Sequence, residues 1–373
     1  MPPRLLPIVL AAACTSTHPV QVTVHDAERS EMAGAGLLMN GFNEAGMCHA
    51  MWLTGDGETL FDIDCEPGHR FFRMKPSSDG RDILLASNRD GDGLVPDGFI
   101  LRIPLDGGIP MRTEAPLIHH DFVELAEGFA YLSYVEDQRL IQGQRANLAT
   151  DTVVEVSEGG SDHRVVFDFL TDYPVAPYWS CSHMRGHGWL PDHNEWTHTN
   201  SLVPHPTDDA WLLMPRYLDA VIKVDRATST VDWQLGGRHD FFDLSLDDAL
   251  SHPHMSHAFD DRLLVFDNST GHGALRRERS RVVEYQLDEE GHRAEVVWVY
   301  EDPQPQTTGF LGDAKRLTDG NTLVVWSDRG KVTEVTPEGD IVWELRLPYG
   351  QNTGRVEVMG LDLPGTVAPH PWP

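Results

Sequence analysis

The residues with the clearest chemical potential lie between positions 196 and 237. Asn200 follows His198 by two positions and Arg216 follows it by eighteen, and all of them fall near the ends of expected strands. Imidazole and amide groups can donate hydrogen bonds, and the guanidinium group carries a fixed positive charge. Such side chains would form a cradle for an oxyanion, so the segment predicts a binding site for a group such as sulfate.

Two further patterns suggest metal ligands, and each has a simpler explanation. Imidazoles bind Zn²⁺, but neither an HExxH motif nor paired CxxC motifs accompany the histidines of this chain. The residues from Asn88 onward resemble the start of a calcium-binding loop, but the twelfth position is Phe99, where such a loop has glutamate. We therefore expect no metal and no cofactor, with a weak calcium site as an alternative. The zinc pattern comprises His183, His187, His193, His252, His254 and His257, and the calcium pattern comprises Asn88, Asp90, Asp92 and Gly93.

The chain is long and acidic. Its 373 residues, 40% of them hydrophobic, can bury a substantial core. Its 58 acidic residues outnumber its 29 basic residues, and the formal charge of -29 repels nucleic acid and anionic lipid surfaces. We expect no nucleic-acid partner. An anionic substrate would need a site where arginine and histidine are locally concentrated.

Residues 1–14 have the features of an export signal. Arg4 supplies a positive charge, residues 5–13 form a short apolar run, and small residues precede Cys14. The sequence LAAAC resembles a bacterial lipobox, although Ala11 stands where leucine is usual. We expect a signal peptide and a lipid anchor at Cys14, and hence a periplasmic or cell-surface location. Secretion without a lipid and a cytosolic protein with an apolar start are the alternatives.

The other cysteines leave the redox chemistry open. If Cys14 carries a lipid, then Cys48, Cys65 and Cys181 remain, and at least one of them is unpaired. An Asp-Gly turn between Cys48 and Cys65 predicts a hairpin that would bring their thiols together. A disulfide and a pair of small buried thiols are both compatible with this pattern.

The pattern along the chain is a short strand, a tight turn and another strand. Segments such as FVELAEGFAYLSY and KRLTDGNTLVVW cluster apolar residues around an acidic or glycine turn, as half-buried antiparallel strands do. Most units continue into a second strand pair, and four strands make one blade of a β-propeller. We predict an all-β, six-bladed propeller with long inter-strand loops. A β-sandwich, the alternative, does not explain this rhythm.

The predicted propeller domain spans residues 15–363. The first of its blades is incomplete, so residues 20–41 or residues 356–361 would complete it and close the ring. Residues 364–373 form a proline-rich, loose tail. The predicted blades begin near Met51, Phe72, His120, His198, His254 and Gly312.

Several segments resemble the bacterial arylsulfotransferases, which are PAPS-independent aryl-sulfate sulfotransferases. The resemblance implies a six-bladed propeller with its active site at the central channel. It also implies that a sulfuryl group passes from an aryl sulfate to a phenol by a ping-pong route through a sulfated histidine. The likeness spans roughly residues 35–350 and is carried by WTHTNSL, PRYLDAVIKVD, HHDFVEL, SRVVEYQLDEE and GDAKRLTDGNTLVVW.

The resemblance assigns roles to individual residues. His198 and Asn200 match the sulfate-contacting histidine and asparagine of the family. Arg216 matches its sulfate-binding arginine, and His120 matches another active-site histidine, although the adjacent His119 could take the same role. Taken singly, these residues are better explained as satisfied histidines at strand ends, a turn asparagine and a partner for a carboxylate. Their joint spacing reverses this preference for His198, Asn200 and Arg216.

The nucleophile of the family is a histidine before a strand pair that ends in Phe-Asp-Asn, here residues 266–268. Counting back from this ending selects His254, with His257 as the runner-up and His252 close beside them. Neutral imidazole suits the reaction because sulfate oxygens would repel an anionic nucleophile. Its ordinary pKa of about 6.5 leaves much of it neutral at pH 7, and its nitrogen can leave in the second transfer.

Aromatic side chains in loops would either stack on an aryl substrate or pack in the core. Two other functions remain alternatives: a metal-dependent propeller hydrolase or lactonase, and a non-catalytic surface propeller that binds a ligand. The sequence determines neither the natural donor and acceptor nor the oligomeric state. The aromatic residues in question are Tyr178, Trp179, Trp189, Phe241, Phe242 and Phe310.

Overall fold

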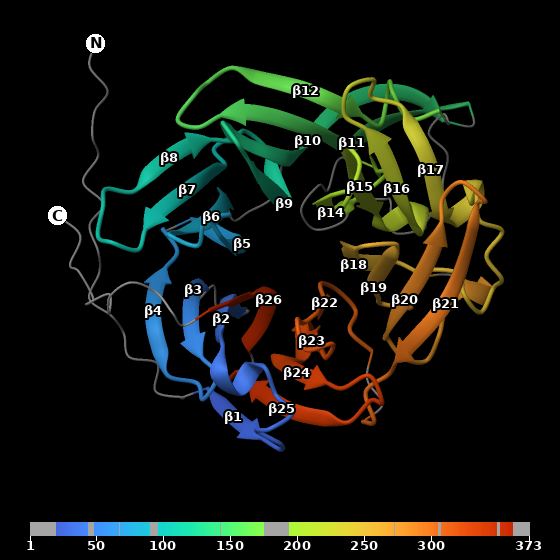
Figure 1. Ribbon diagram of the computed structural model, residues 1–373. Coiled ribbons are helices and arrows are strands. Elements are labelled where there is room, and N and C mark those ends of the chain that lie inside the picture. The colour runs from blue at the N-terminus through green and yellow to red at the C-terminus, as the bar shows by residue number, and fades with distance from the viewer. Residues whose placement is uncertain are drawn as a thin grey trace, which may run out of the picture.

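The computed structural model describes most of the chain between residues 20 and 360 as six antiparallel sheets around a common axis. Figure 1 shows β26, β5, β9, β14, β18 and β22 nearest to the axis, one from each sheet. The prediction of an all-β, six-bladed propeller is confirmed. The described residues are 20–43, 48–66, 68–89, 96–141, 143–174, 194–271, 273–304, 307–348 and 351–360.

The first three blades, with strands named outward from the axis, are as follows. Blade 1 contains β26 (Gln351–Met359), β2 (Gly36–Asn43), β3 (Cys48–Thr54) and β4 (Thr59–Asp64). Blade 2 contains β5 (His69–Pro76), β6 (Asp82–Arg89), β7 (Phe99–Pro104) and β8 (Met111–Glu114). Blade 3 contains β9 (Ile118–Leu125), β10 (Gly128–Ile141), β11 (Gln144–Ser157) and β12 (His163–Asp168), and the short β13 (Asn194–Glu195) pairs with β11 in parallel.

The remaining blades follow the same order. Blade 4 contains β14 (Thr199–Pro204), β15 (Ala210–Pro215), β16 (Ala220–Asp225) and β17 (Val231–Gly236). Blade 5 contains β18 (Pro253–Phe259), β19 (Arg262–Asp267), β20 (Arg281–Asp288) and β21 (Arg293–Tyr300). Blade 6 contains β22 (Asp313–Arg316), β23 (Thr322–Trp326), β24 (Lys331–Val335), β25 (Ile341–Arg346) and β1 (Gln21–Val24).

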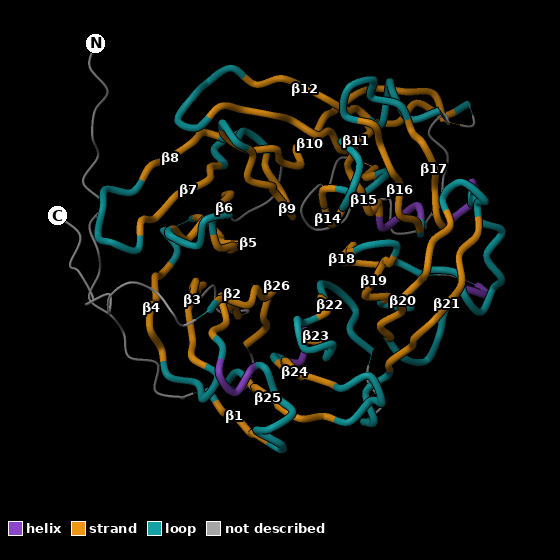
Figure 2. Tube along the Cα trace, in the orientation of Figure 1, coloured by secondary structure: helices purple, strands orange, loops and turns teal. Residues whose placement is uncertain are grey.

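Helical structure is confined to short 3-10 turns in the loops of the described chain, drawn in purple in Figure 2. Among the described residues, no helix has the length and apolar character needed to cross a membrane. The turns are η1 (Met32–Gly34), η3 (Arg216–Leu218), η4 (Gly237–His239), η5 (Gly273–Leu275) and η6 (Ser327–Arg329).

Both ends of the described chain take part in closing the ring. β26 pairs antiparallel with β2, with Met359 opposite Gly36, and thereby supplies the innermost strand of blade 1. At the outer edge of blade 6, β1 pairs with β25, with Gln21 opposite Arg346. Both segments that the sequence offered for closure are therefore used.

One predicted blade start is wrong. Met51 lies in β3, the third strand of blade 1 from the axis, because the innermost strand of this blade comes from the far end of the sequence. The other predicted starts lie in or directly before an innermost strand: Phe72, His120, His198, His254 and Gly312.

Apolar side chains fill each interface between neighbouring blades. Trp196 and Trp211 pack between blades 3 and 4, Trp326 packs between blades 5 and 6, and Trp343 packs between blades 6 and 1. Full burial of one large apolar side chain contributes roughly 1.5–3 kcal/mol. These interfaces hold the innermost strands in fixed positions around the axis.

The disulfide that the sequence left open is confirmed. Cys48, at the start of β3, is bonded to Cys65, just after β4, so the bond joins the two ends of one hairpin. Cys14 and Cys181 lie outside the described residues, as do the predicted signal peptide and the tail at residues 364–373.

The backbone is strained where the chain enters three neighbouring innermost strands. His120, His198 and His252 have φ angles of 51°, 52° and 53°, which lie in the left-handed region. Such a conformation costs a non-glycine residue about 1–3 kcal/mol and is found most often at functional sites. The register also shifts within β9, β14 and β18. Bulges of this kind turn side chains toward active sites.

Candidate active site

Histidines from three consecutive blades meet at the axis. His120 lies in β9, His198 directly precedes β14, and His254 lies in β18. The ring centroids of His120 and His198 are 4.7 Å apart, and those of His120 and His254 are 6.3 Å apart. We call these three side chains, together with Arg216, the axial histidine site. The fold thus brings together residues that the sequence spreads over blades 3, 4 and 5.

The spacing between His198 and Arg216 is the product of one hairpin. β14 and β15 pair antiparallel with Thr199 opposite Pro215. His198, directly before β14, and Arg216, directly after β15, therefore lie side by side at the same end of this hairpin. The Arg216 N–H donates to the His198 carbonyl at 3.1 Å. In the side chain of Arg216, Nη2 donates to the carbonyl of Gly309 at 3.1 Å, while the buried Nε has no hydrogen-bond partner within the described chain. Arg216 therefore keeps a donor for a ligand.

The His254 ring is held in one tautomer. Its Nδ1 lies 3.0 Å from the carbonyl oxygen of Gly312, at the entrance to β22. A carbonyl can only accept, so Nδ1 carries the proton and Nε2 carries the lone pair in the neutral ring. This arrangement leaves Nε2 as a nucleophile.

His257 has the opposite arrangement. The backbone N–H of Arg316 donates to His257 Nδ1 at 3.0 Å, which occupies the lone pair of that nitrogen. The proton of the neutral ring must then sit on Nε2, and no nucleophilic nitrogen remains. The ring centroid of His252 lies 5.8 Å from that of Tyr217, and the backbone N–H of His252 donates to Asp219. The ring contacts of His254 therefore favour it over His257.

A carboxylate that the sequence did not single out orients His198. Glu195 Oε2 lies 2.8 Å from His198 Nδ1, and Glu195 Oε1 accepts a hydrogen bond from the Tyr134 hydroxyl at 3.0 Å. The angles of this contact fall short of a hydrogen bond, but the negative charge of the carboxylate lies where it would stabilise positive charge that develops on the ring during a reaction. Glu195 stands three positions before His198, and this spacing is the one signal by which the sequence could have indicated it.

His120 is oriented through a second histidine. Its Nδ1 lies 2.8 Å from His119 Nδ1, and His119 Nε2 lies 3.2 Å from Asp151 Oδ1. The His119 ring stacks on Tyr134 with centroids 3.9 Å apart, and Tyr134 in turn bonds to Glu195. His119 therefore orients His120. Tyr134 contacts both His119, which orients His120, and Glu195, which faces His198.

Two of the axial rings are kept neutral. Burial is the largest cause that lowers the pKa of His120 and of His254 well below the ordinary value of 6.5. Neighbouring histidines lower the pKa of His120 further, and Arg355 and Arg216 do the same for His254. Neutral imidazole is the form that can attack a sulfate ester.

Asn200 and Asn268 fix the strands that carry the site. Asn200 Nδ2 donates to the carbonyl of Pro253 at 3.1 Å, directly before His254, while its buried Oδ1 has no hydrogen-bond partner in the described part of the chain. Asn268 Nδ2 donates to the carbonyls of Thr308 and Leu311 at 2.7 and 2.9 Å. At least one amide hydrogen of Asn200 therefore serves to position β18.

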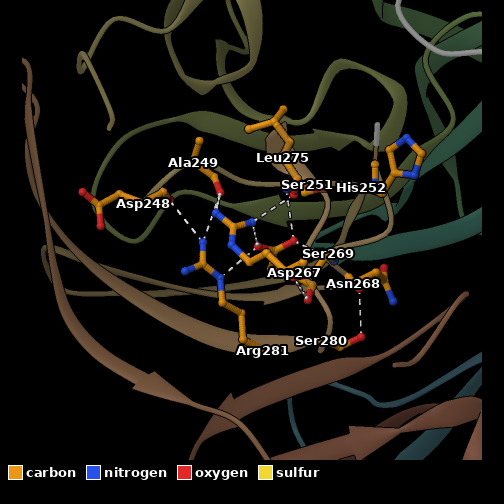
Figure 3. Close-up of polar contacts among 12 residues, drawn as sticks. Asp248, Ala249, Ser251, His252, Asp267, Asn268, Ser269, Leu275, Ser280 and Arg281 are labelled. Carbon is orange, nitrogen blue, oxygen red and sulfur yellow. Dashed lines mark hydrogen bonds and ion pairs between the residues drawn. The ribbon is translucent and has the colours of Figure 1, made fainter. Parts of the chain in front are cut away.

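The Asp267 carboxylate anchors the loop that leads to His254. It accepts from the N–H groups of Ser251 and Ser269 at 3.1 and 3.0 Å and from Arg281 Nε at 3.0 Å. Figure 3 shows Asp267 and Arg281 facing each other while the ring of His252 points away from them. The Phe-Asp-Asn ending that located the nucleophile in the sequence thus has a structural role.

Further along the innermost strands lies a cavity of about 260 Å³ with charged walls. Arg73 Nε and Lys75 Nζ lie 3.1 and 2.9 Å from Asp121 Oδ1, and Arg73 and Lys315 both bind Glu357. We call it the ionic cavity. It is lined by Arg73, Lys75, Asp121, His257, Asp313, Lys315 and Glu357, with apolar and small residues between them.

The metal patterns of the sequence are not assembled in the described residues. The rings of His254 and His257 have different backbone partners, and His183, His187 and His193 lie outside the described chain. Asn88 donates to the carbonyl of Ile118, and the rest of the calcium pattern lies outside. Within the described ranges, two other groups could hold an ion, and neither includes an axial residue: His49, Asp62 and Asp64; and His205, Asp208 and Glu289.

The predicted aromatic residues separate into different environments. Phe242 is buried and packs against Trp233, so it belongs to the core. Phe241 and Phe310 are exposed, and Phe310 lies beside Gly309, which Arg216 contacts. Tyr178, Trp179 and Trp189 lie outside the described residues.

The fold and the site define a six-bladed propeller that gathers neutral histidines and a partly unpaired arginine at its axis. The model of the arylsulfotransferase (ASST) family matches residues 110–342, a stretch that contains every residue of the axial histidine site. The chain therefore belongs to the arylsulfotransferase family. This membership supports aryl sulfotransferase activity in general.

Comparisons with individual proteins add the fold alone. No curated protein matches the chain. A protein of unknown function from Bacteroides caccae is 14% identical, with a TM-score of 0.50 over 87% of this chain and 99% of that one. The Cps50 (Swd1) β-propeller domain from Myceliophteria thermophila is 12% identical, with a TM-score of 0.46 over 88% and 90%. Apo AztD from Citrobacter koseri is 9% identical, with a TM-score of 0.43 over 87% and 98%.

Proposed function

We propose that the protein transfers a sulfuryl group from an aryl sulfate to a phenol by a ping-pong route, with His254 as the nucleophile. The observation that carries this proposal is the contact between His254 Nδ1 and the Gly312 carbonyl, which leaves Nε2 with its lone pair. Burial and the nearby cations keep the ring neutral, because they lower its pKa. The family membership supports aryl sulfate and phenol as the substrate classes.

In the first half-reaction, His254 Nε2 attacks the sulfur atom. The N–S bond forms, the bond between sulfur and the aryl oxygen breaks, and the phenolate leaves. The positive charge of the sulfated ring is stabilised by the hydrogen bond from Nδ1 to Gly312. Arg216 Nε, which lacks a partner in the described chain, would bind an oxygen of the sulfuryl group.

Proton transfer is assigned to His198. Its Nδ1 lies 2.8 Å from the Glu195 carboxylate, whereas burial and positive neighbours lower the pKa of His120. Protonated His198 gives a proton to the leaving phenolate and then accepts one from the second phenol. The second phenol attacks sulfur, the S–N bond breaks, and His254 returns to its neutral state.

The surroundings of the site are compatible with an aryl group and an oxidising compartment. Phe310 is 44% exposed beside the loop that Arg216 contacts, where its ring could stack on a phenol. The Cys48–Cys65 disulfide supports export, because structural disulfides persist mainly outside the cytosol. Export with a lipid at Cys14 is part of this proposal. Labelling with palmitate that depends on Cys14 would test it.

The test of the function uses a chromogenic aryl sulfate and a phenol acceptor. Purified protein should release the chromophore faster when a second phenol is added, and the sulfated second phenol should appear in equal amount. His254→Ala should abolish both signals, while His257→Ala should retain them. Activity that a chelator removes would instead favour the metal-dependent hydrolase, and release that ignores the acceptor would reject transfer.

A further inference from the structure

A second buried arginine lies at the axis, outside the part of the chain that the family model matches. Arg355 belongs to β26, the innermost strand of blade 1, and only 2% of its surface is exposed. Its Nη1 lies 2.7 Å from Asp121 Oδ2, but the angles of this ion pair fall short of a hydrogen bond, and Nη2 has no partner in the described chain. A buried guanidinium group rarely leaves its donors unused.

The neighbours of Arg355 place it against the axial histidine site. Asp121, its ion-pair partner, directly follows His120 in β9. On the other side, the N–H of Val356 donates to Asp313, which directly follows Gly312, the residue whose carbonyl holds His254. The chain at Arg355 therefore lies between the residue that follows His120 and the residue that follows Gly312, the hydrogen-bond partner of His254.

Arg355 and Arg216 come from opposite sides of the ring. In the order of the sheets, blade 1 and blade 4 are separated by two blades in either direction, and Figure 1 shows β26 and β14 across the axis from each other. A group held between these two arginines would lie on the axis, where His254 of blade 5 and His120 of blade 3 also converge.

The charge around Arg355 is locally positive in an otherwise acidic protein. Arg73, Lys75 and Arg355 all contact the single carboxylate of Asp121. Together with Lys315 these cations number four, and they share three carboxylates, those of Asp121, Glu357 and Asp313. The guanidinium of Arg355, with an unused nitrogen, is the member of this group left to attract an external anion.

We propose that Arg355 is a second sulfuryl-binding residue, which binds a non-bridging oxygen of the sulfate group from the side of the axis opposite Arg216. This inference rests on the proposed sulfuryl transfer and adds to it a cation from the ring-closing strand. With Arg216, Arg355 would hold the sulfur atom in line with His254 Nε2 and withdraw charge from the sulfuryl oxygens while the bond to the aryl oxygen breaks. The second role of Arg355 would be to help keep His254 neutral, because its positive charge lowers the pKa of that ring.

The structure offers a matched control in Arg73. Arg73 is equally buried and binds the same carboxylate, Asp121. All of its nitrogens are engaged, however, because Nε binds Asp121, Nη1 donates to the carbonyl of Met74 and Nη2 binds Glu357. A purely structural arginine at the axis should behave as Arg73 does.

The experiment measures binding without turnover. Phenyl sulfate and inorganic sulfate are titrated calorimetrically into the full chain with His254→Ala, alone or combined with Arg355→Lys, Arg355→Met or Arg73→Lys. Loss of a charged hydrogen bond predicts binding weakened roughly 10-fold to 100-fold for Arg355→Met and less for Arg355→Lys. Arg73→Lys should change binding by no more than about twofold and lower the melting temperature. If Arg355→Met does not fold, Arg355→Lys carries the test, because lysine keeps the charge that faces Asp121.

The outcomes separate this inference from the proposed function. In the enzyme with His254 intact, Arg355→Met should lower kcat/KM for chromophore release by about 100-fold. If the wild-type protein transfers sulfuryl groups and both Arg355 variants bind and react as Arg73→Lys does, Arg355 is structural and the inference is wrong. If the wild-type protein shows no transfer, the proposed function fails, and the dependence of sulfate binding on Arg355 still decides the inference.

Discussion

The axial histidine site and the ionic cavity both bury charged side chains on the same axis, but they differ in how completely those charges are paired. In the ionic cavity, the cations Arg73, Lys75 and Lys315 each have a carboxylate partner. At the histidine site, Arg216 keeps a buried nitrogen without a partner among the described residues, and so does the neighbouring Arg355. The two buried polar regions therefore differ in whether their arginines have nitrogens without a partner in the described chain.

Of the two regions, the axial histidine site is the one whose arginines keep donors that a ligand could use. An unsatisfied buried donor costs roughly 1–3 kcal/mol. The ionic cavity shows that this architecture can pair its buried charges. The unpaired donors at the histidine site would be satisfied by the oxygens of a bound anion, and the left-handed histidines that surround them add further strain.

The two regions also treat their histidines differently. The Nδ1 of His254 faces a carbonyl oxygen, whereas the Nδ1 of His257, which lines the ionic cavity, accepts from a backbone N–H. Burial lowers the pKa of both rings, to about 4 in His257. Burial therefore favours the neutral form of both rings, and the two rings differ in tautomer, because only His254 keeps the lone pair on Nε2.

The largest expected effect comes from removing the nucleophile. His254→Ala should lower sulfuryl transfer by roughly 10⁴-fold or more, because it removes the nitrogen, Nε2, that we propose attacks sulfur. Initial rates of chromophore release with a phenol acceptor measure this loss. His257→Ala is the matched control on the same strand and should stay within about threefold of the wild type. The reverse pattern would place the reaction in the ionic cavity.

Replacing Arg216 should have the next largest effect. Arg216→Met removes the donor that Nε offers, and the loss of one preorganised donor typically lowers kcat by about 10²–10³-fold. Arg102→Met is the control, because all three nitrogens of Arg102 in blade 2 bind carboxylates, those of Glu158, Asp82 and Glu124. Single-turnover measurements at saturating aryl sulfate report the chemical step. Equal losses in both variants would show a general effect of removing an arginine.

Glu195→Gln should give a smaller loss that depends on the leaving group. The amide keeps the shape of Glu195 but no longer stabilises positive charge on His198, so protonation of the phenolate becomes harder. The rate should fall about 10-fold to 100-fold with an aryl sulfate whose phenol is weakly acidic and far less with a nitrophenyl sulfate. A plot of rate against leaving-group acidity is the measurement. A uniform loss across substrates would mean that Glu195 has only a structural role.

The smallest effect on transfer is expected in the ionic cavity. Lys315→Met removes one partner of Glu357, which should lower stability by about 1–3 kcal/mol and change the transfer rate by less than about threefold. The cations around Glu357 lower its pKa from 4.5 to about 2, so its contribution to stability is complete above pH 4.5 and is lost as the pH falls toward 2. Urea unfolding across this range should show the difference between wild type and variant shrinking toward pH 2. A large loss of transfer in a folded variant would show that the ionic cavity also takes part in the reaction.

The parts of the site that depend on pairing between neighbouring strands could be predicted from the sequence. The spacing of His198 and Arg216 reflects a single hairpin, with Thr199 opposite Pro215, and such a hairpin is readable from alternating strands and a turn. The six-bladed fold was predictable for the same reason. The start of the first blade was not, because its innermost strand, β26, pairs with β2 from the other end of the chain.

The remaining parts of the site depend on contacts between distant segments. Glu195 lies in the two-residue strand β13, whose position depends on pairing with β11. Arg355 reaches the axis only through ring closure, and its neighbour Asp121 comes from blade 3. The choice among three closely spaced histidines required the carbonyl of Gly312, which lies 58 residues after His254. No local pattern carries that information.

The mass of the protein after reaction with an aryl sulfate in the absence of acceptor decides whether His254 carries the sulfuryl group. We expect a gain of one sulfuryl group, mapped to His254 by fragmentation, which disappears when a phenol is added and never forms in His254→Ala. A wild-type protein that transfers sulfuryl groups while its mass stays unchanged, or that carries the group on another residue, would rule out His254 as the nucleophile.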